Sequence, residues 1–272
     1  MKFALKNMTV AEFRDRLSPD AGKPPVILLP FGSTEEQGPH APMGDYMIAE
    51  KLALRVAEVS GAIAAPCVPF GYAEFFRAFP GGIQLRAKTF CSVVEDVVGA
   101  FLDHGIERLV ILNGHTTNAF LIDQVLRKVR RETGVAVASI DLWRAIPESL
   151  WQDMHGENAA VARGHGGDPL TSLAMHLFPE LMRPDLARPT TRYQAMDLPI
   201  TGATGVRFEG MPLNLPLNAD EVNPDGMMGG DPSLASAEKG RAIFDHLTGV
   251  CARLVAHLQI SDLRNLDVKA LE

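Results

Sequence analysis

The stretch VILLPFGSTEEQGPH, residues 26–40, passes abruptly from an apolar run into a dense group of polar side chains. The apolar part is typical of a buried strand, and the polar part begins where that strand would end. This polar part is therefore either a solvent-exposed loop or a set of ligands for a metal ion, and its candidate residues are Glu35, Glu36, Gln37 and His40.

Three further apolar runs, at 61–72, 108–115 and 135–143, are typical of short buried strands. Apolar residues at helical spacing fill the segments 90–105 and 119–134, and each of these segments ends in Gly, the favoured residue just after a helix. This alternation predicts an α/β fold with a mostly parallel sheet that is covered on both faces by helices.

The two ends of the chain carry helix signals of their own. The TVAE capping box at Thr9 predicts a short helix, and residues 231–258 predict a terminal helix with Asp231 as its N-cap and Pro232 in its first position. Residues from about 188 to 232 are rich in Pro, Gly and Met and predict long loops or short strands. No repeat or linker divides the chain, so we expect a single domain over residues 1–272.

Composition excludes several classes of protein. The chain is 46% hydrophobic with a net charge of −7, which argues against nucleic-acid binding, because that needs clustered Lys and Arg. Its three cysteines are widely spaced and odd in number, which indicates reduced thiols. We find neither a signal-peptide core nor the roughly 18 apolar residues that a membrane span needs. We therefore expect a soluble, cytoplasmic protein with no membrane or nucleic-acid partner.

In a mostly parallel sheet, the ligand site lies beyond the carboxyl ends of the strands. The polar groups at 33–40 and 113–118 both follow predicted strands and so fall at that edge. Glu35, Glu36, Asp45 and His115 supply the carboxylates and imidazole that divalent metals bind. From spacing alone, a metal site and a solvated loop both remain open.

The eight histidines differ in their surroundings. His165 lies in the glycine-rich segment ARGHGGDPLTS, ahead of a helix that Pro169 could start with Asp168 as its N-cap. We expect His155 in a surface loop and His40 in a structural role. Besides His115, which is among the candidate metal ligands, four more lie in helical patterns and have expected structural roles: His104, His176, His246 and His257.

Five segments together resemble the creatininase (creatinine amidohydrolase) family. GSTEEQGPHAPMGD (32–45) is similar to its signature GSxEQHGPHLPLGTD, and NGHTTN (113–118) is similar to its NGHxxN. FPGGIQLR (79–86), the segment 164–187 and GGDPSLASAEKG (229–240) resemble three further blocks, in the expected order. The resemblance implies a three-layer α/β/α fold, a homo-oligomer that is usually a hexamer, and a divalent-metal site that typically holds two ions.

The family pattern implies that Glu35, Asp45 and His115 hold one ion, whereas the usual positions of the second ion's own ligands carry Gln37, Thr117 and Leu170. Neither Thr nor Leu replaces an anionic ligand, and Gln offers only a neutral oxygen. One bound ion, Zn²⁺ or Mn²⁺, is therefore the expectation, and a second is in doubt.

The resemblance also assigns the remaining site residues. His165 matches the family histidine that handles protons, and Phe76 stands where many members carry a histidine. Glu36 stands where the family usually has Gln, so it is a replacement ligand, a base or a substrate hydrogen-bonder. We expect His165 and Glu36 to be catalytic. The residues expected to bind substrate or support the ligands are Gln37, His40, Thr117 and Asp168.

These assignments favour a metal-dependent hydrolase that acts on a small cyclic amide or a related carbonyl metabolite. Creatinine itself is disfavoured, because a two-metal site normally generates the nucleophile. Two alternatives stay open. One is a hydrolase that cleaves a C–C bond in a cyclic polyol ketone, and the other is an inactive, metal-free binding, regulatory or structural member of the fold.

Overall fold

The computed structural model describes residues 1–18, 22–191, 193–201 and 205–270, and a four-stranded parallel sheet lies at its centre. The strands are β1 (Ile27–Phe31), β2 (Ile63–Ala64), β3 (Leu109–Asn113) and β4 (Ala138–Asp141), in the spatial order β2-β1-β3-β4. Strands β1 and β3 pair along their full length, from Ile27 opposite Leu109 to Phe31 opposite Asn113. The mostly parallel sheet expected from the sequence is confirmed.

The two central strands are buried on both faces, which explains why their sequences are continuously apolar rather than alternating. Successive side chains point to opposite faces of a strand, so Leu28 and Val110 enter one core while Leu29 and Ile111 enter the other. Each face of the sheet therefore has its own hydrophobic core.

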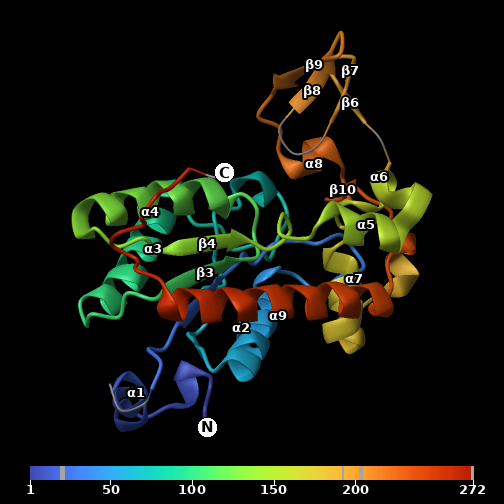
Figure 1. Ribbon diagram of the computed structural model, residues 1–272. Helices are drawn as coiled ribbons and strands as arrows, with labels where there is room; N and C mark the ends of the chain where they lie inside the picture. Colours follow the sequence, from blue (N-terminus) through green and yellow to red (C-terminus); the bar gives the residue numbers. More distant parts are fainter. Residues whose placement is uncertain (19–21, 192, 202–204, 271–272) are drawn as a thin grey trace.

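Helices form the two outer layers (Figure 1). On one face lie α2 (Tyr46–Ser60) and α9 (Ala237–Ile260), and on the other lie α3 (Ala87–Leu102) and α4 (Asn118–Thr133). Gly61 directly follows α2 and Gly134 directly follows α4, and both glycines adopt the left-handed conformation that closes a helix. The three-layer α/β/α fold is thereby confirmed.

Shorter elements complete the chain. The further α-helices are α1 (Val10–Leu17), α5 (Glu148–His155), α6 (Ala159–Ala162), α7 (Leu170–Leu177) and α8 (Ala219–Val222). The 3-10 helices are η1 (Leu5–Asn7), η3 (Glu74–Phe76), η4 (Gly156–Asn158), η5 (Pro179–Leu181), η6 (Pro184–Leu186) and η7 (Pro232–Leu234). Strand β5 (Gly164–His165) pairs with β10 (Met228–Gly229), β6 (Gln194–Ala195) with β7 (Leu198–Pro199), and β8 (Gly205–Phe208) with β9 (Met211–Asn214). Figure 1 shows β6 to β9 projecting from the body as an arm.

The start of the terminal helix differs from the sequence prediction. Asp231 caps the 3-10 helix η7 by accepting a hydrogen bond from Ser233 N, while α9 begins only at Ala237, with Ser236 as its N-cap. Ser236 accepts a hydrogen bond from the main-chain N–H of Lys239, so a second N-cap starts α9 just after the 3-10 turn. The second predicted strand is also shorter than its apolar run, because only Ile63 and Ala64 pair regularly with β1.

The sheet order creates a switch point. From β1 the chain crosses through α2 to β2 on one side, and from β2 it returns through α3 to β3 on the other side of β1. Such a reversal leaves a crevice at the carboxyl ends of the two strands where ligands bind. The segments that leave β1 and β3 there contain residues 32–45 and 113–118. No helix among the described residues is both long and apolar enough to span a membrane.

Candidate metal and catalytic site

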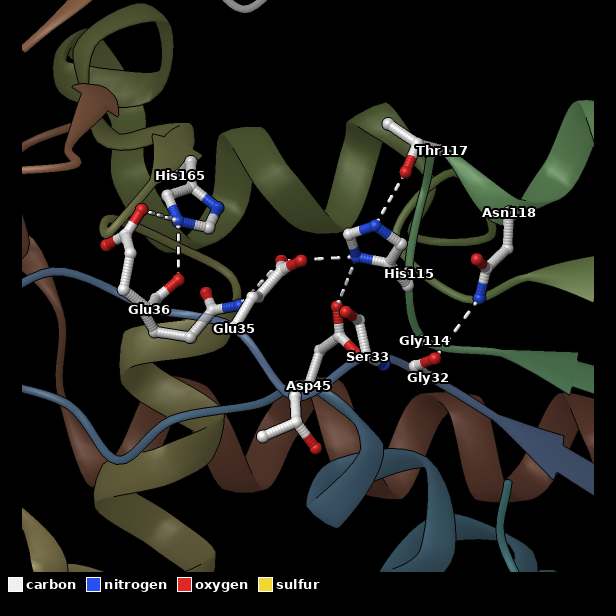
Figure 2. Close-up of polar contacts among 12 residues, drawn as sticks. Gly32, Ser33, Glu35, Glu36, Asp45, Gly114, His115, Thr117, Asn118 and His165 are labelled. Atoms are coloured by element: carbon white, nitrogen blue, oxygen red, sulfur yellow. Dashed lines mark hydrogen bonds and ion pairs between the residues drawn. The ribbon is translucent and has the colours of Figure 1, made fainter. Parts of the chain in front are cut away.

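Three buried side chains from the two strand ends converge. His115 Nδ1 lies 2.8 Å from Asp45 Oδ2 and 3.1 Å from Glu35 Oε1 (Figure 2). The exposed fraction of each residue is 4% or less. Within the described part of the chain, this is the one group of three or more His, Cys, Asp or Glu residues whose ligand atoms all lie within 4.8 Å of one another.

Asp45 is fixed by the loop that follows β1. Its Oδ1 accepts a hydrogen bond of 2.7 Å from the main-chain N–H of Ser33. The loop can pass this close because residue 32 is Gly, where any Cβ would strike the backbone of Tyr46 and the Asp45 carboxylate. One oxygen of Asp45 therefore holds the loop while the other faces His115.

The turn after β3 sets the orientation of His115. Asn113 accepts from the main-chain N–H of His115 and donates to its carbonyl oxygen, which forms a closed turn. On the ring, Nε2 faces the carbonyl oxygen of Tyr72 at 3.2 Å and the hydroxyl of Thr117 at 2.6 Å. A proton on Nε2 directed at a backbone carbonyl leaves Nδ1 to face the carboxylates, which is the pattern that orients metal-binding histidines.

Burial and charge shift the pKa values of these groups. Burial raises the pKa of Asp45 to about 7, although the neighbouring His115 opposes the shift. For His115, burial alone would lower the pKa, but the carboxylates of Glu35 and Asp45 together raise it well above its usual value. Without a metal ion, the same two neighbours that raise this pKa favour the protonated form of the His115 ring.

The donor set fits a divalent cation. Two carboxylates and one imidazole are ligands of the kind that Zn²⁺ and Mn²⁺ accept. Glu35 Oε2 and Gln37 Oε1 are also buried and have no hydrogen-bond partner among the described residues. Such unpartnered oxygens are costly inside a protein, and coordination to an ion would satisfy them.

The three positions that the family resemblance assigns to a second ion carry no anionic side chain: Gln37, Thr117 and Leu170. Gln37 donates its amide to Glu35 Oε1 at 3.1 Å, and the Thr117 hydroxyl is engaged by His115 and the Tyr72 carbonyl. Leu170 lies on the wall of the same cavity with a purely apolar side chain. The described residues thus provide a candidate site for one ion, in agreement with the sequence prediction.

Glu36 lies with His165, apart from the three converging ligands. His165 Nε2 is 3.0 Å from Glu36 Oε1 and 2.8 Å from the Glu36 carbonyl oxygen (Figure 2). Burial alone would lower the pKa of His165, but the adjacent Glu36 carboxylate raises it overall. Phe76 stacks on the His165 ring at a centroid distance of 4.4 Å, so it packs against the imidazole from a position where the family often carries a histidine.

His40 and Asp168 support the surrounding loops. His40 Nε2 is hydrogen-bonded to the Thr171 hydroxyl at 3.0 Å. Asp168 accepts from both the main-chain N–H and the hydroxyl of Ser172, while Pro169 occupies the N-cap position predicted for Asp168.

The expectation of a surface loop for His155 is wrong. This residue ends α5, is only 7% exposed, packs on Trp151 and lies 3.2 Å from Asp168. Its polar sequence neighbours gave no sign of this burial, because it depends on α5 packing against a segment that follows it in the chain.

A cavity of about 340 Å³ adjoins the site. It is lined by the metal-ligand candidates, by His165 and by a mainly apolar wall that includes Phe75, Phe76, Trp143, Trp151, Ile146 and Met228. Trp143 also donates a hydrogen bond of 2.6 Å to the Gly114 carbonyl oxygen, so it packs against the His115 turn as well as lining the cavity. Sequence reasoning missed two arginines that line this cavity, Arg144 and Arg163.

The model of the creatininase family, described as creatinine amidohydrolase, matches residues 6–255. Creatinine amidohydrolase of Pseudomonas putida is 30% identical over 174 residues, which cover 58% of this chain and 66% of that protein. A 3-dehydro-scyllo-inosose hydrolase of Thermotoga maritima is 26% identical, over 67% of this chain and 58% of its own. The chain thus spans less than two thirds of the length of either relative.

A third relative is matched over more of its length. The mycofactocin precursor peptide peptidase of Mycobacterium ulcerans is 28% identical over 85% of both chains. Among solved structures, one described as "Creatininase Mn" superposes with a TM-score of 0.76 at 24% identity, covering 96% of this chain and 100% of the other. The family match spans nearly the whole sequence, and the fold agrees with it. The chain therefore belongs to the creatininase (creatinine amidohydrolase) family.

Proposed function

We propose that the protein is a metal-dependent hydrolase that cleaves an amide or a related carbonyl compound. The observation that carries this proposal is the convergence of Glu35, Asp45 and His115, buried and with unpartnered oxygen atoms, on a cavity that His165 also lines. Zn²⁺ or Mn²⁺ is the ion that we assign to the site. A divalent ion there supplies Lewis-acid polarisation of a carbonyl group and lowers the pKa of a water molecule.

His165 is the residue to which we assign proton transfer. Its Nε2–H is engaged by the two oxygens of Glu36, so the neutral ring carries its lone pair on Nδ1. Among the described residues, Nδ1 has no hydrogen-bond partner. A histidine whose proton affinity is raised by a carboxylate can hold a proton at Nδ1 and deliver it to a leaving group.

Glu36 acts in this proposal through His165. Its carboxylate fixes the orientation of the ring and stabilises the protonated imidazole. The place of Glu36 beside His165 favours this positioning role over its use as a replacement metal ligand. The loops around the ligands and the cavity are held by the hydrogen bonds of four side chains: Gln37, Thr117, His40 and Asp168.

The cavity favours an amide over a polyol. Its wall is mainly aromatic and aliphatic, whereas a cyclic polyol ketone would need many hydrogen-bonding partners. The relatives named as hydrolases and as a peptidase make a C–N bond the first candidate for cleavage. We retain C–C cleavage of a cyclic polyol ketone as a second candidate, because one relative is named as an inosose hydrolase.

The test combines metal analysis with a substrate screen. The purified protein is loaded with Mn²⁺ or Zn²⁺, its metal content is measured, and hydrolysis of lactams, hydantoins, formamides, inososes and short peptides is followed. Close to one ion per chain together with turnover of an amide supports the proposal. Protein that stays metal-free after loading would instead support an inactive binding or structural member of the family.

We also propose that the chain is one domain and assembles as a cytoplasmic homo-oligomer, a hexamer by the family resemblance. Light scattering of the purified protein measures its mass directly. A monomer at micromolar concentration would contradict this part of the proposal.

A further inference from the structure

Arg163 is one of two arginines among the residues that line the mainly apolar cavity. It immediately precedes Gly164 and His165, so its main chain is continuous with that of the residue to which we assign proton transfer. The inference drawn from it rests on the proposed function and concerns the chemical class of the substrate.

The guanidinium group of Arg163 is held in place by an aromatic ring. Its central carbon lies 4.3 Å from the ring of Trp151, and Trp151 is itself 1% exposed and donates its indole N–H to the Ala159 carbonyl oxygen. A guanidinium stacked on a fixed indole is restricted in direction, and its N–H donors at the edge stay available.

The main chain beneath Arg163 is equally constrained. Strand β5, which starts at the next residue, pairs with β10, and Gly164 lies so close to Gly229 that no side chain fits between them. The N–H of Gly164 donates to the carbonyl oxygen of Asp168 at 3.2 Å. Arg163 thus projects from a rigid platform, as a residue that binds a specific group must.

The donors of Arg163 are largely unused within the described chain. No side-chain hydrogen bond from Arg163 to another described residue is present, and its one ion pair is a 3.8 Å contact to the exposed Glu148. By contrast, Arg183 and Arg264 each make bidentate contacts with a carboxylate. The guanidinium N–H groups of Arg163 are therefore available to bind a carboxylate of a molecule outside the chain.

We propose that the substrate carries a carboxylate that Arg163 binds, joined to an apolar body that occupies the aromatic cavity. A planar, two-oxygen anion matches the guanidinium fork, and the apolar body matches Phe75, Phe76 and Trp151. The bond to be cleaved then lies between these two parts or beside them, within reach of His165. The carboxylate belongs either to a free small acid or to the C-terminus of a peptide, and the experiment separates these sources.

Arg144 provides a matched comparison on the same cavity. Its side chain is 66% exposed, and its guanidinium is 3.5 Å from Asp141, with no aromatic ring beneath it among the described residues. We assign the carboxylate to Arg163, whose side chain is 47% exposed, because it lies over the Trp151 ring. Among the described residues, Arg144 has no such support and has a closer charged neighbour in Asp141.

The test measures binding and needs no turnover. Calorimetry on the Mn²⁺-loaded protein compares N-acetylphenylalanine with N-acetylphenylalaninamide, which differ only in the carboxylate. Two further acids identify the source: 3-phenylpropionate represents a free small acid, and an acetylated tripeptide that ends in Phe represents a peptide. The same titrations are made with Arg163→Gln and Arg144→Gln, and the metal content and melting temperature of every sample are recorded.

We expect the acid to bind at least about tenfold more tightly than the amide, which is the gain typical of a charge-assisted bidentate contact. Arg163→Gln should remove this preference by weakening the acid alone, while Arg144→Gln should change it by less than about threefold. Tighter binding of the tripeptide than of phenylpropionate would identify a peptide C-terminus, and the reverse order a free acid.

Three results would overturn the inference. They are equal binding of acid and amide, failure of every acid to bind, and a preference for the acid that survives in Arg163→Gln, since the metal ion would then be the anchor. A protein that holds no metal yet still prefers the acid would count against the proposed hydrolase and leave the carboxylate site standing.

Discussion

His165 Nε2 lies within hydrogen-bonding distance of two oxygens of one residue, the carbonyl oxygen of Glu36 at 2.8 Å and its carboxylate at 3.0 Å. A single N–H shared between these acceptors leaves the ring little freedom to rotate, and Phe76 stacks on the ring to restrict it further. The loop after β1 thereby controls a histidine that is distant in sequence.

Replacing Glu36 by Gln should lower the turnover of the metal-loaded enzyme by about 10²- to 10⁴-fold, the usual contribution of proton transfer by a positioned group. The amide keeps the size of the side chain but removes the charge that stabilises protonated His165. Metal content should stay at the wild-type level, because Glu36 lies outside the group formed by Glu35, Asp45 and His115. A loss of metal in this variant would show that Glu36 is a ligand after all.

Gly226 should control the same contact because it packs directly against the Glu36 carboxyl group. A Cβ at this position would strike the Glu36 carboxyl group, so Gly226→Ala should push Glu36 away from His165 and reduce turnover. Gly210 is the matched control, since it has a similar positive φ of +85°, but a Cβ added there would meet no atom within 4 Å. Both variants should lose about 1 kcal/mol of stability to backbone strain. Equal turnover in the two variants would argue against the clash.

Asp45→Asn should abolish tight metal binding and leave the fold intact. The Asn oxygen can still accept the hydrogen bond from Ser33 N, so the loop is retained while the ligand charge is lost. Asp141→Asn is the control, because Asp141 ends the neighbouring strand β4 but is not one of the three converging residues. Metal analysis and circular dichroism report the two properties separately. Full metal occupancy in Asp45→Asn would refute the ligand assignment.

The wild-type protein should bind one ion per chain, and a double substitution should add a second. Gln37→His together with Thr117→Glu supplies an imidazole and a carboxylate at the two positions where the family resemblance expects ligands. Metal content should then rise from about one to about two ions per chain, the pair of ligands being what a second ion needs. Two ions bound by the unchanged protein would show that neutral groups suffice there.

Acid should destabilise the metal-free protein in part through His40. Burial lowers the pKa of His40 below its usual 6.5, although Glu36 opposes the shift. The unfolded chain then binds more protons than the folded one as the pH falls below about 6.5, so the free energy of unfolding decreases, by at most about 1.4 kcal/mol per pH unit for one group.

Denaturant unfolding of the metal-free protein at pH 7.5 and pH 5.5 measures this loss. The loss should be smaller in His40→Gln than in the wild type, while His257→Gln, at an exposed position on α9, should behave as the wild type does. An unchanged loss in His40→Gln would assign the effect to other groups, of which His155 is the first candidate because burial also lowers its pKa.

The parts of the fold that were predicted from sequence are those set by local patterns. Continuous apolar runs identified β1 and β3, and Gly134 marked the end of α4. The edge of the sheet where the site lies also followed, because polar segments directly succeed both strands. These features depend on residues that are neighbours in the chain.

The features that were missed depend on contacts between distant segments. The burial of His155 requires Asp168 and Trp151 to surround it, and the orientation of Arg163 requires the Trp151 ring. The partner of Glu36 was equally hidden, since a strand-end carboxylate can turn toward either neighbouring loop. Periodicity carries no information about such choices.

The three proposed ligands come from two loops, and Asp45 and His115 are 70 residues apart in sequence. An ion held between them would act as a cross-link that exists only in the folded chain, since the unfolded chain keeps these groups apart. The melting temperature should then follow the free concentration of the metal. Scarcity of the ion would thus shorten the lifetime of the protein as well as silence it, so that the cell's supply of metal determines how much folded enzyme persists.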